Sequence, residues 1–458
     1  MSPHSTPGLE SLGKVHFIGI GGVGMSAVAR IMLARGVPVS GSDAKDLPVM
    51  ADLAAAGARI AVGYAAANLD DAQTVVAGSA IRGDNPELAA ARQAGLPVLH
   101  RSQALAATMG EDTVVTVAGT HGKSTTTSMI TVLLKAAGLD PSFAVGANIP
   151  ALGVNAAHGT SGIFVAEADE SDGSFLNYRP RIAVVTNVEP DHLDYYGTAE
   201  AVYESFDRFT GLLPADGLLV ACADDAGALA LAERTRARGN TRVVLYGTDG
   251  RADIRLDDGG PGHVAVSAAG VGYGLSLQVP GRHNALNAAA AFAVALELGV
   301  APEAAAAGLA HFSGASRRFE LKGSARGVRV FDDYAHHPTE VRAALTAARS
   351  VAGGHKVHVL FQPHLFSRTR EFAAEFAQAL NLADTALVLD IYPAREDPIP
   401  GVTSQLIADH LDKGGRLVSA ADAVDTLAGT AADGDVVLTV GAGDVTAFGP
   451  RIVEALRA

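Results

Sequence analysis

Several residue types and patterns are missing from this chain, and each absence excludes a class of protein. Cys222 is the one cysteine among 458 residues, which excludes an internal disulfide framework and a zinc site built from several cysteines. Basic residues number 35 against 49 acidic ones, so the chain has no overall positive charge of the kind that nucleic-acid binding requires. Its densest basic run, at residues 234–242, suits a solvated helix end better than a nucleic-acid patch. We therefore expect no nucleic-acid partner.

Long apolar runs are missing as well. No uncharged apolar stretch is long enough to cross a bilayer, and the N-terminal segment lacks the basic start and apolar centre of a signal peptide. We therefore expect a cytoplasmic protein with no membrane partner. The sequence gives no expectation for the oligomeric state.

The residues that are present indicate a compact α/β enzyme. Glycine occurs 51 times and apolar residues make up 48% of the chain, which is typical of that class, and the length suits about three domains. Short apolar runs alternate with glycine turns and helical patterns, which predicts mostly parallel sheets covered by helices. We expect a Rossmann-like domain over residues 1–110, a central P-loop ATPase-like domain over 111–320 and a second Rossmann-like domain over 321–458.

The first block opens with a glycine loop between a strand and a helix. The apolar run VHFIGI leads into GGVGMS, so Gly19, Gly21 and Gly24 form the pattern G-x-G-x-x-G, and Asp43 ends the next apolar run. Such glycines let a pyrophosphate approach the backbone, and the acid can reach a ribose hydroxyl. The ligand is a dinucleotide or another nucleoside diphosphate, unless the glycines serve only a tight turn.

The second block repeats strand, turn and helix with a different loop, AGTHGKS. Gly119, Gly122, Lys123 and Ser124 match the end of a phosphate-binding loop, but Val117 replaces its first glycine. Backbone N–H groups would hold the phosphates, the Lys123 ammonium would meet the β and γ oxygens, and the Ser124 hydroxyl would bind Mg²⁺. The pattern predicts a nucleotide site.

Acidic residues follow the next apolar runs. Glu167, Asp169, Glu170 and Asp172 end the run IFVAEADESD, and His192 ends VTNVEPDH. Since parallel strands end at one edge of a sheet, we expect these groups beside the phosphate loop, where a cation would need carboxylates. Each acid could instead cap a helix or face solvent, and His192 could be a hydrogen-bonding support because Mg²⁺ prefers oxygen.

The third block carries aromatic and basic residues after two of its apolar runs. Tyr334, His336 and His337 precede an expected helix, and the next run is followed by His364, Arg368 and Arg370, either arginine of which could hold an acidic ligand. An arginine is a natural partner for a carboxylate ligand. The histidines could equally cap a helix or pack in the core.

Taken in order, these motifs resemble those of the Mur ligases, the ATP-dependent amide ligases of peptidoglycan precursor synthesis. The series spans nearly the whole chain and comprises HFIGIGGVGMS, AGTHGKSTTT, EADESDGSFL, VTNVEPDHLDYY, GRHNALNAAAA, SRRFE, DDYAHHPTE and QPHLFSRTRE. The resemblance implies a ligase that joins L-alanine to the lactyl carboxylate of UDP-N-acetylmuramate. ATP would phosphorylate that carboxylate, and L-alanine would attack the acyl phosphate to give an amide, ADP and phosphate.

The resemblance also implies which residues bind the two nucleotides. Those implied for the sugar nucleotide, in place of a dinucleotide, are Gly19, Gly21, Gly22, Gly24, Met25, Ser26, Asp43 and Ser79. Those implied for ATP are Gly119, Thr120, His121, Gly122, Lys123, Ser124, Thr125, His283, Asn284, Asn287, Arg318 and Asp333.

The catalytic residues implied by the family are Lys123, Glu167, His192 and Arg318. Lys123 and Arg318 would stabilise the negative charge that develops during phosphoryl transfer. Two Mg²⁺ ions are implied, for which Mn²⁺ could substitute. Ser124 and Glu167 would hold the first ion between the β and γ phosphates, and Glu167 and His192 would hold the second.

The family likewise implies an alanine site on the third domain, whose closure would complete the active site. Tyr334, His336 and Arg368 would line it. Leu365 stands where some members carry an arginine, so recognition of the amino-acid carboxylate would rest on Arg368 alone.

Two other activities remain open. The ligase that recycles an intact tripeptide onto the same sugar nucleotide shares GTHGK and EADE, although SDGSFL favours the alanine-adding members. An NAD-dependent oxidoreductase with an accessory nucleotide domain would also explain the first glycine loop.

The chain has no lysine between Lys135 and Lys322, so its central domain cannot use the carbamylated lysine with which several sister ligases help bind the second Mg²⁺. Counting from His192 places Asp207 near that position, where a carboxylate would offer the same hard oxygen without CO₂. Asp207 could equally face solvent on an amphipathic helix. We therefore expect ligation that is indifferent to bicarbonate, and an Asp207→Ala variant that needs more Mg²⁺. Turnover that disappears in CO₂-depleted buffer and returns with bicarbonate would contradict the first expectation, and an unchanged Mg²⁺ titration the second.

Overall fold

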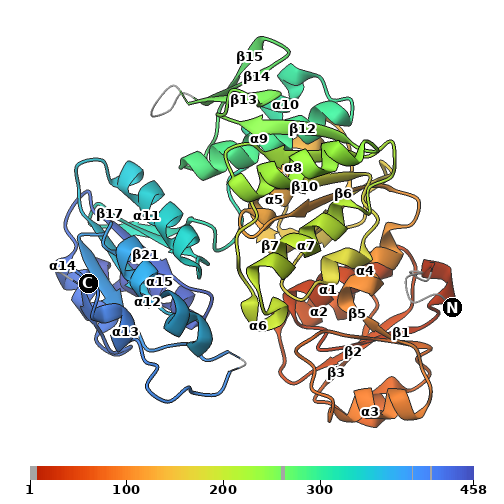
Figure 1. Ribbon diagram of the computed structural model, residues 1–458. Coiled ribbons are helices and arrows are strands. Elements are labelled where there is room, and N and C mark those ends of the chain that lie inside the picture. Colours follow the sequence, from red (N-terminus) through yellow and green to blue (C-terminus); the bar gives the residue numbers. More distant parts are fainter. Residues whose placement is uncertain (1–7, 259–263, 395, 413–414) are drawn as a thin grey trace. The chain divides into compact units, whose positions relative to one another are not determined.

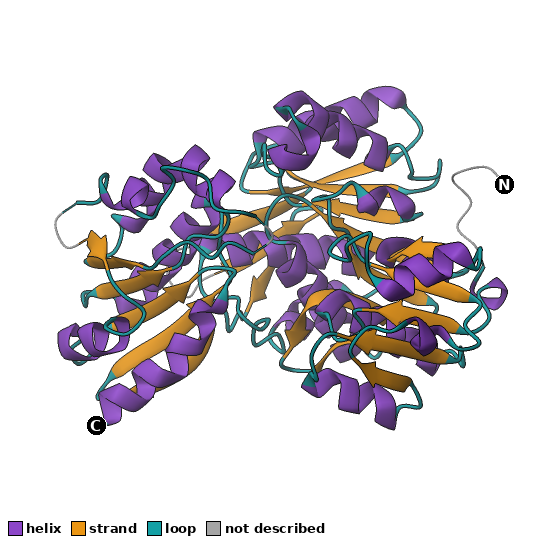
Figure 2. Cartoon of the chain, turned by 90° about the horizontal axis from the view of Figure 1, so that it is seen from below, coloured by secondary structure: helices purple, strands orange, loops and turns teal. Residues whose placement is uncertain are grey.

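The computed structural model describes residues 8–458 apart from 259–263, 395 and 413–414. It contains three α/β domains, each built on one β-sheet with helices packed against it (Figure 1; Figure 2). This architecture confirms the predicted fold class of mostly parallel sheets.

The first domain holds a five-stranded sheet in which every pairing is parallel. In spatial order its strands are β3 Arg59–Val62, β2 Val39–Asp43, β1 Val15–Ile18, β4 Thr74–Ala77 and β5 Val98–His100. Its helices are α1 Val23–Ala34, α2 Pro48–Ala55, α3 Pro86–Gln93 and α4 Arg101–Met109. The strand order reverses between β1 and β4, and sheets of this kind bind ligands at the carboxyl ends of the strands beside that reversal.

The central domain holds a ten-stranded sheet in the order β15-β14-β13-β12-β11-β10-β6-β9-β7-β8. Its strands are β6 Thr113–Ala118, β7 Ser142–Ile149, β8 Val154–Ala157, β9 Ile163–Glu167, β10 Ile182–Val185, β11 Leu218–Cys222, β12 Arg242–Gly247, β13 Ile254–Asp258, β14 Val264–Ala268 and β15 Val271–Leu275. Its helices are α5 Lys123–Ala136, α6 Leu193–Tyr196, α7 Ala199–Thr210, α8 Ala226–Arg238, α9 Arg282–Glu297 and α10 Pro302–Leu309. In spatial order, every pairing between β13 and β7 is parallel. The edge strands β8, β14 and β15 pair antiparallel with their neighbours.

The third domain holds a six-stranded sheet in the order β16-β17-β21-β18-β19-β20. Its strands are β16 Glu320–Ala325, β17 Val328–Asp333, β18 Val357–Phe361, β19 Thr385–Val388, β20 Gly415–Leu417 and β21 Val436–Val440. Its helices are α11 Pro338–Ala352, α12 Phe366–Leu380, α13 Gln405–Ala408, α14 Ala423–Thr430 and α15 Phe448–Arg457. Leu438 packs in one apolar cluster with Val359, whereas its neighbour Val437 packs in another with Leu360. Successive strand residues face opposite sides, so a strand covered on both sides reads as a continuous apolar run.

By packing, the chain forms two compact units. One comprises Met1–Ser276 and Leu286–Phe312 and holds the first two sheets; the other comprises Leu277–Ala285 and Ser313–Ala458 and holds the third. We propose domain limits near residues 110 and 320, where one sheet gives way to the next.

The helical patterns of the sequence predict helices over residues 25–34, 125–137 and about 284–298. All three are present and begin two residues earlier, α1 at Val23, α5 at Lys123 and α9 at Arg282. The first two follow glycine N-caps, which make no side-chain cap and therefore leave no polar signal in the sequence. Cys222 ends the buried strand β11. None of the helices in the described residues is both long and apolar enough to cross a bilayer.

A buried carboxylate organises the first domain. Glu87 on α3 has no exposed surface and accepts hydrogen bonds from Ser42 Oγ at 2.5 Å, Asn68 Nδ2 at 2.6 Å and the Ala65 backbone at 3.2 Å. His16 Nε2 lies 3.4 Å from the same carboxylate. Burial alone would raise the pKa of Glu87, but these hydrogen bonds together lower it below its ordinary value. Glu87 thereby ties β1, β2 and the loop after β3 to α3.

Replacing this carboxylate should loosen the first sheet. Glu87→Ala leaves the Ser42 hydroxyl and the Asn68 amide without their acceptor, which costs about 2–4 kcal/mol. Because the pKa is lowered on folding, the stabilisation is complete above the ordinary value of 4.5 and is lost as the pH falls through the folded-state value. Hydrogen exchange in β1, β2 and β4 would measure the loss.

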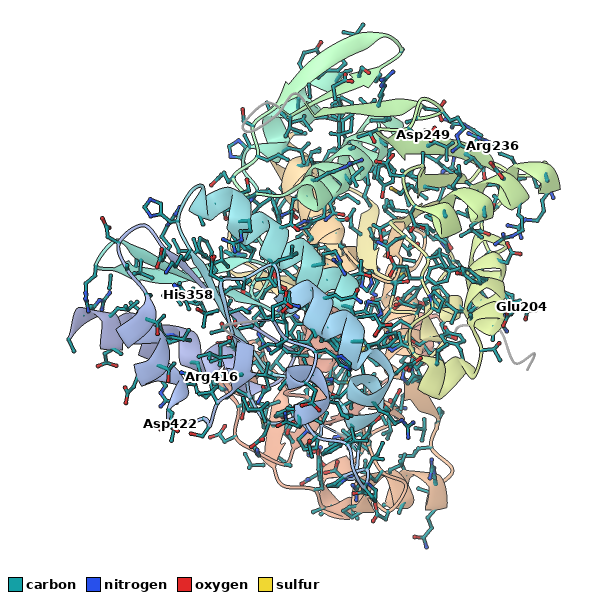
Figure 3. All side chains as sticks on the ribbon, turned by 60° about the vertical axis from the view of Figure 1, so that its left-hand side comes forward. Glu204, Arg236, Asp249, His358, Arg416 and Asp422 are labelled. Atoms are coloured by element: carbon teal, nitrogen blue, oxygen red, sulfur yellow. The ribbon has the colours of Figure 1, made fainter. Side chains whose placement is uncertain are left out.

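The matched control is Glu204→Ala, at an exposed position of α7 in the central domain (Figure 3). It should leave exchange in the first sheet unchanged. Equal exchange in the two variants would contradict the role of Glu87.

Candidate active site

The phosphate loop lies between β6 and α5, and its glycines adopt backbone conformations that other residues rarely take. Gly119 has a φ of 135°, and a Cβ there would lie 2.1 Å from Thr186 Oγ1. Gly122 has a φ of 84° and is the N-cap of α5, with no side-chain cap. The N–H groups from Lys123 to Thr125 therefore have no acceptor within the helix, and the positive end of the helix dipole favours an anion. Ser124 lies in this turn and is buried.

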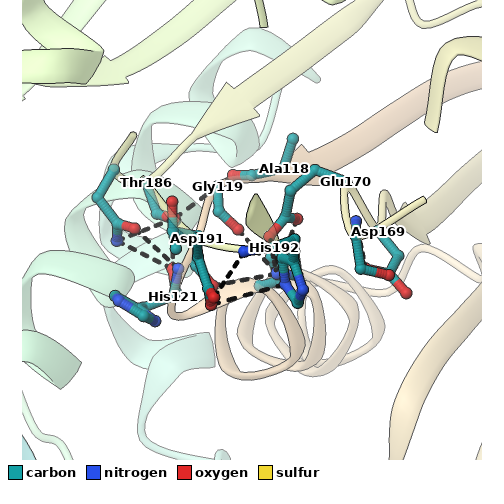
Figure 4. A network of polar contacts seen from close by, with 12 residues as sticks. Ala118, Gly119, His121, Asp169, Glu170, Thr186, Asp191 and His192 are labelled. Atoms are coloured by element: carbon teal, nitrogen blue, oxygen red, sulfur yellow. Dashed lines mark hydrogen bonds and ion pairs between the residues drawn. The ribbon is translucent and has the colours of Figure 1, made fainter. Parts of the chain in front are cut away.

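Residues that follow β10 hold this loop. The Thr120 N–H donates to Asn187 O at 3.1 Å, and the His121 N–H donates to Asn187 Oδ1 at 2.8 Å. The His121 carbonyl accepts from Thr186 Oγ1 at 2.5 Å and from Asn187 Nδ2 at 3.0 Å. Figure 4 shows Thr186 and His121 side by side in this network.

Lys123 extends back over the loop and forms a buried ion pair. Its Nζ donates to Gly119 O at 2.8 Å and Thr120 O at 3.1 Å, and it lies 2.8 Å from Glu170 Oε2. Burial alone would lower the pKa of Lys123, but Glu170, Asp169 and Glu167 raise it, so the ammonium stays charged. Burial raises the pKa of Glu170 to about 7 against the lowering effect of Lys123.

The other strand-end groups lie around this pair, as expected for parallel strands that end at one edge. His192 Nε2 is 3.7 Å from Glu170 Oε1 and 3.6 Å from Asp191 Oδ2 (Figure 4). Glu167 Oε2 accepts a hydrogen bond from the Gly146 N–H at 2.7 Å. The structure therefore brings Glu170, which the sequence marked only as part of an acidic cluster, to the centre of the site.

In the first domain, the glycine loop follows β1 and begins α1. Gly19 has a φ of 81°, and Gly22 is the N-cap of α1 with no side-chain cap. The Gly21 N–H donates to Asp43 Oδ2 at 3.0 Å, so the carboxylate expected to reach a ribose already holds the loop. Met25 and Ser26 follow in the first turn of α1, where both are buried.

Side chains of the first two domains meet beside this loop. Ser79 Oγ donates to Asp172 Oδ2 at 2.8 Å and lies 3.1 Å from His100 Nε2. The Arg101 guanidinium abuts Gly24, because a Cβ on that glycine would lie 2.6 Å from Arg101 Nη1. A guanidinium next to an uncapped helix N-terminus suits a diphosphate.

In the third domain, the predicted residues gather at the carboxyl ends of β17 and β18. The Tyr334 ring lies 4.8 Å from Arg317 Cζ and 5.3 Å from Arg318 Cζ, measured from its centroid. His336 Nδ1 lies 3.0 Å from Tyr334 O, and its imidazole pairs with Glu340 at 3.4 Å. His337 is the N-cap of α11, which was one of the two roles expected for it.

Asp333 holds the backbone around these groups. Its carboxylate accepts hydrogen bonds from the Phe319 and Ala335 N–H groups, each at 2.8 Å. Burial raises the pKa of Asp333 to about 6, although Arg318 acts to lower it. The contacts of Asp333 in the third domain thus position the segments that carry Arg318 and Tyr334.

The remaining predicted residues lie on two helices. Arg368 on α12 is buried, and Leu365 is the N-cap of that helix with a φ of 72°. On α9, Asn284 Nδ2 donates to Pro280 O at 2.6 Å, and burial lowers the pKa of His283 to about 4. Asn287 Oδ1 would lie 2.9 Å from a Cβ on Gly122, so its amide packs against the phosphate loop.

The metal role expected of Asp207 is wrong. Its carboxylate accepts hydrogen bonds from Arg234 Nε at 3.1 and 3.2 Å and pairs with Arg238 at 3.8 Å. The side of α7 that faces the site is marked by Ser205, whose Oγ lies 3.3 Å from the Tyr196 hydroxyl; that hydroxyl donates to Glu170 O. Asp207 is two positions after Ser205 and therefore lies on the opposite side of the helix. It points toward α8 and away from the site. The absence of a central lysine, and with it the bicarbonate prediction, is unaffected.

The sequence analysis did not identify Thr186 and Asn187 as contacts of the loop before α5, or Arg101 as a contact of the first glycine loop. A polar pair directly after an apolar strand was a usable signal for the first two, because strand ends supply loop contacts in parallel sheets. Arg101 carried no such signal, since a single arginine before a helix is common on protein surfaces.

Three family models match successive parts of this chain. Residues 14–113 match the model of the Mur ligase family catalytic domain, residues 117–295 match the Mur ligase middle domain, and residues 317–443 match the Mur ligase glutamate ligase domain.

Relatives and solved structures cover the same length. The chain is 79% identical over 452 residues to the UDP-N-acetylmuramate–L-alanine ligase of Paenarthrobacter aurescens, covering 99% of each protein. It is 81% identical over 450 residues to that of Arthrobacter sp. strain FB24, covering 98% of this chain and 96% of the relative. The crystal structure of the UDP-N-acetylmuramate–alanine ligase of Thermotoga maritima matches with a TM-score of 0.79 at 31% identity, over 97% of this chain and 99% of that one. With all three family domains in order along its sequence, the chain belongs to the Mur ligase family.

Proposed function

We propose that this protein joins L-alanine to the lactyl carboxylate of UDP-N-acetylmuramate, with conversion of ATP to ADP and phosphate, as a step in peptidoglycan precursor synthesis. The observation that supports this most directly is the phosphate loop with Lys123 facing the strand-end carboxylates, in a chain 79% identical along 99% of its length to a ligase of that name.

The central domain would activate the carboxylate. Free N–H groups at the start of α5 and the Lys123 ammonium would bind the β and γ phosphates, whose negative charge grows as the γ-phosphoryl group moves. Lys123 stays protonated because three carboxylates surround it. The incoming phosphates would compete with Glu170 for this ammonium, so the ion pair would keep Lys123 oriented before ATP binds.

The donor set fits a hard cation. Ser124 and Glu167 offer the oxygen ligands that Mg²⁺ prefers, and His192, whose Nε2 lies 3.7 Å from Glu170 Oε1, would add an imidazole. We propose that these three residues hold Mg²⁺, or Mn²⁺ in its place, which would offset phosphate charge when bound.

The third domain would supply the amine. Tyr334, His336 and the Arg368 guanidinium are proposed to hold L-alanine, with Arg368 as the partner of its carboxylate. The Arg318 guanidinium would stabilise the negative charge of the reacting phosphate. The sugar nucleotide would lie on the first glycine loop, where Ser79 and Asp43 are already ordered by hydrogen bonds.

The proposed activity is tested by its substrate requirement. We expect phosphate release only when ATP, UDP-N-acetylmuramate and an amino acid are all present, with L-alanine the best of a panel that includes serine and glycine. A colorimetric phosphate assay, with mass spectrometry of the product, would measure this.

Two results, one from that assay and one from an NADH titration, would overturn the proposal. Preference for an intact tripeptide over L-alanine would favour a recycling activity, which has structural support because a murein peptide ligase from Psychrobacter arcticus matches with a TM-score of 0.71 at 27% identity, over 97% of this chain and 99% of that one. Saturable NADH binding that UDP-N-acetylmuramate fails to displace would favour an oxidoreductase.

Removing the loop lysine should abolish ligation without unfolding the protein. In Lys123→Ala, the buried Glu170 loses its partner, and because its pKa is already raised to about 7 it can take up a proton rather than remain as an unpaired charge. We expect a fall in kcat of at least about 1000-fold, with circular dichroism unchanged. Arg236→Ala, at an exposed end of α8 (Figure 3), is the control; turnover within a few-fold of the parent in Lys123→Ala would rule out the loop assignment.

A further inference from the structure

The loop that holds ATP in the proposed function lacks the first glycine of a full phosphate-binding loop, and the structure shows how its backbone N–H groups are divided. Two of them are already used: the Thr120 N–H bonds to Asn187 O at 3.1 Å, and the His121 N–H bonds to Asn187 Oδ1 at 2.8 Å. The N–H groups that follow, from Gly122 to Thr125, have no acceptor within helix α5 because they belong to its N-cap and first turn.

The peptide between His121 and Gly122 marks the change from one set to the other. Its carbonyl oxygen accepts hydrogen bonds from Thr186 Oγ1 at 2.5 Å and from Asn187 Nδ2 at 3.0 Å. A trans peptide is planar, with its C=O and N–H pointing in opposite directions. Fixing the His121 carbonyl toward the end of β10 therefore directs the Gly122 N–H away from β10.

The surrounding packing allows this loop little freedom. Gly119 has no room for a side chain, because a Cβ would lie 2.1 Å from Thr186 Oγ1 and 3.1 Å from Asn187 N. Thr186 is buried, and its hydroxyl also lies 3.4 Å from Ala118 O. Thr120 Oγ1 continues the same contacts, since it accepts from the Glu189 N–H at 2.9 Å. Successive residues of the segment after β10 therefore contact successive residues of the loop.

We propose that Thr186 and Asn187 are positioning residues for nucleotide binding: they hold the His121 peptide so that the phosphates are bound by the N–H groups from Gly122 onward and by Lys123. Thr120 and His121 then contribute only indirectly, as the part of the loop that is tied to Asn187. This inference rests on the proposed ATP-dependent function and identifies which groups of the loop carry out the binding.

The experiment compares nucleotides that differ only in phosphate number. AMP, ADP and a non-hydrolysable ATP analogue are titrated by calorimetry into the parent protein, Thr186→Val and Thr186→Ser. Valine matches threonine in shape but lacks the hydroxyl, whereas serine keeps it. We expect Thr186→Val to weaken ADP and the ATP analogue by about 10-fold, in line with the loss of one hydrogen bond, while AMP and UDP-N-acetylmuramate change little and Thr186→Ser binds as the parent does.

Asn187→Ala removes two hydrogen bonds between the side-chain amide and the His121 backbone, one to its N–H and one to its carbonyl. This variant should therefore lose more ADP affinity than Thr186→Val. Should Asn187→Ala fail to fold, the threonine pair alone decides the question. Equal ADP affinity in Thr186→Val and the parent would overturn the inference, as would an equal loss for AMP, ADP and UDP-N-acetylmuramate, which would indicate general destabilisation. A parent protein that binds no ADP at all would instead contradict the proposed function.

Discussion

The buried ion pair between Lys123 and Glu170 is the interaction on which the central domain depends. An ammonium removed from water is costly unless every one of its protons finds an acceptor. Here two loop carbonyls and one carboxylate accept them. Meeting that requirement brings together the ends of β6 and β9, and His192, after β10, lies against the same carboxylate. The candidate site is therefore built around the Lys123 ammonium.

The same device recurs in the other two domains. Glu87 and Asp333 are buried carboxylates that accept hydrogen bonds from backbone or side-chain groups of neighbouring loops. In each case the loops lie next to the strand ends where the substrate groups are expected. A carboxylate is suited to this because it can accept several hydrogen bonds at once, and bonds to a charged acceptor are stronger than neutral ones.

The loop between β6 and α5 shows how contacts from another segment can hold a shortened phosphate-loop motif. A full loop surrounds the phosphates with successive N–H groups. Here Asn187 accepts hydrogen bonds from two of these N–H groups, those of Thr120 and His121, and so holds the loop in place. The remaining N–H groups coincide with the start of α5, where the helix dipole adds to their effect. Val117 stands in place of the first glycine, and the loop that follows is held by contacts from Thr186 and Asn187, which come directly after β10.

The sequence by itself determined the elements whose signals are local: the two glycine loops, the apolar strands, the strand-end acids and the order of motifs that identifies the family. These depend on backbone freedom at glycine and on side-chain periodicity, which neighbouring residues reveal. It could not determine that Glu170 pairs with Lys123, that Asn187 holds His121, or that Asp207 turns toward Arg234 and Arg238. Those pairings join residues far apart in the chain, and only the parallel sheet, by ending β6, β9 and β10 at one edge and packing α7 against α8, decides which side chains meet.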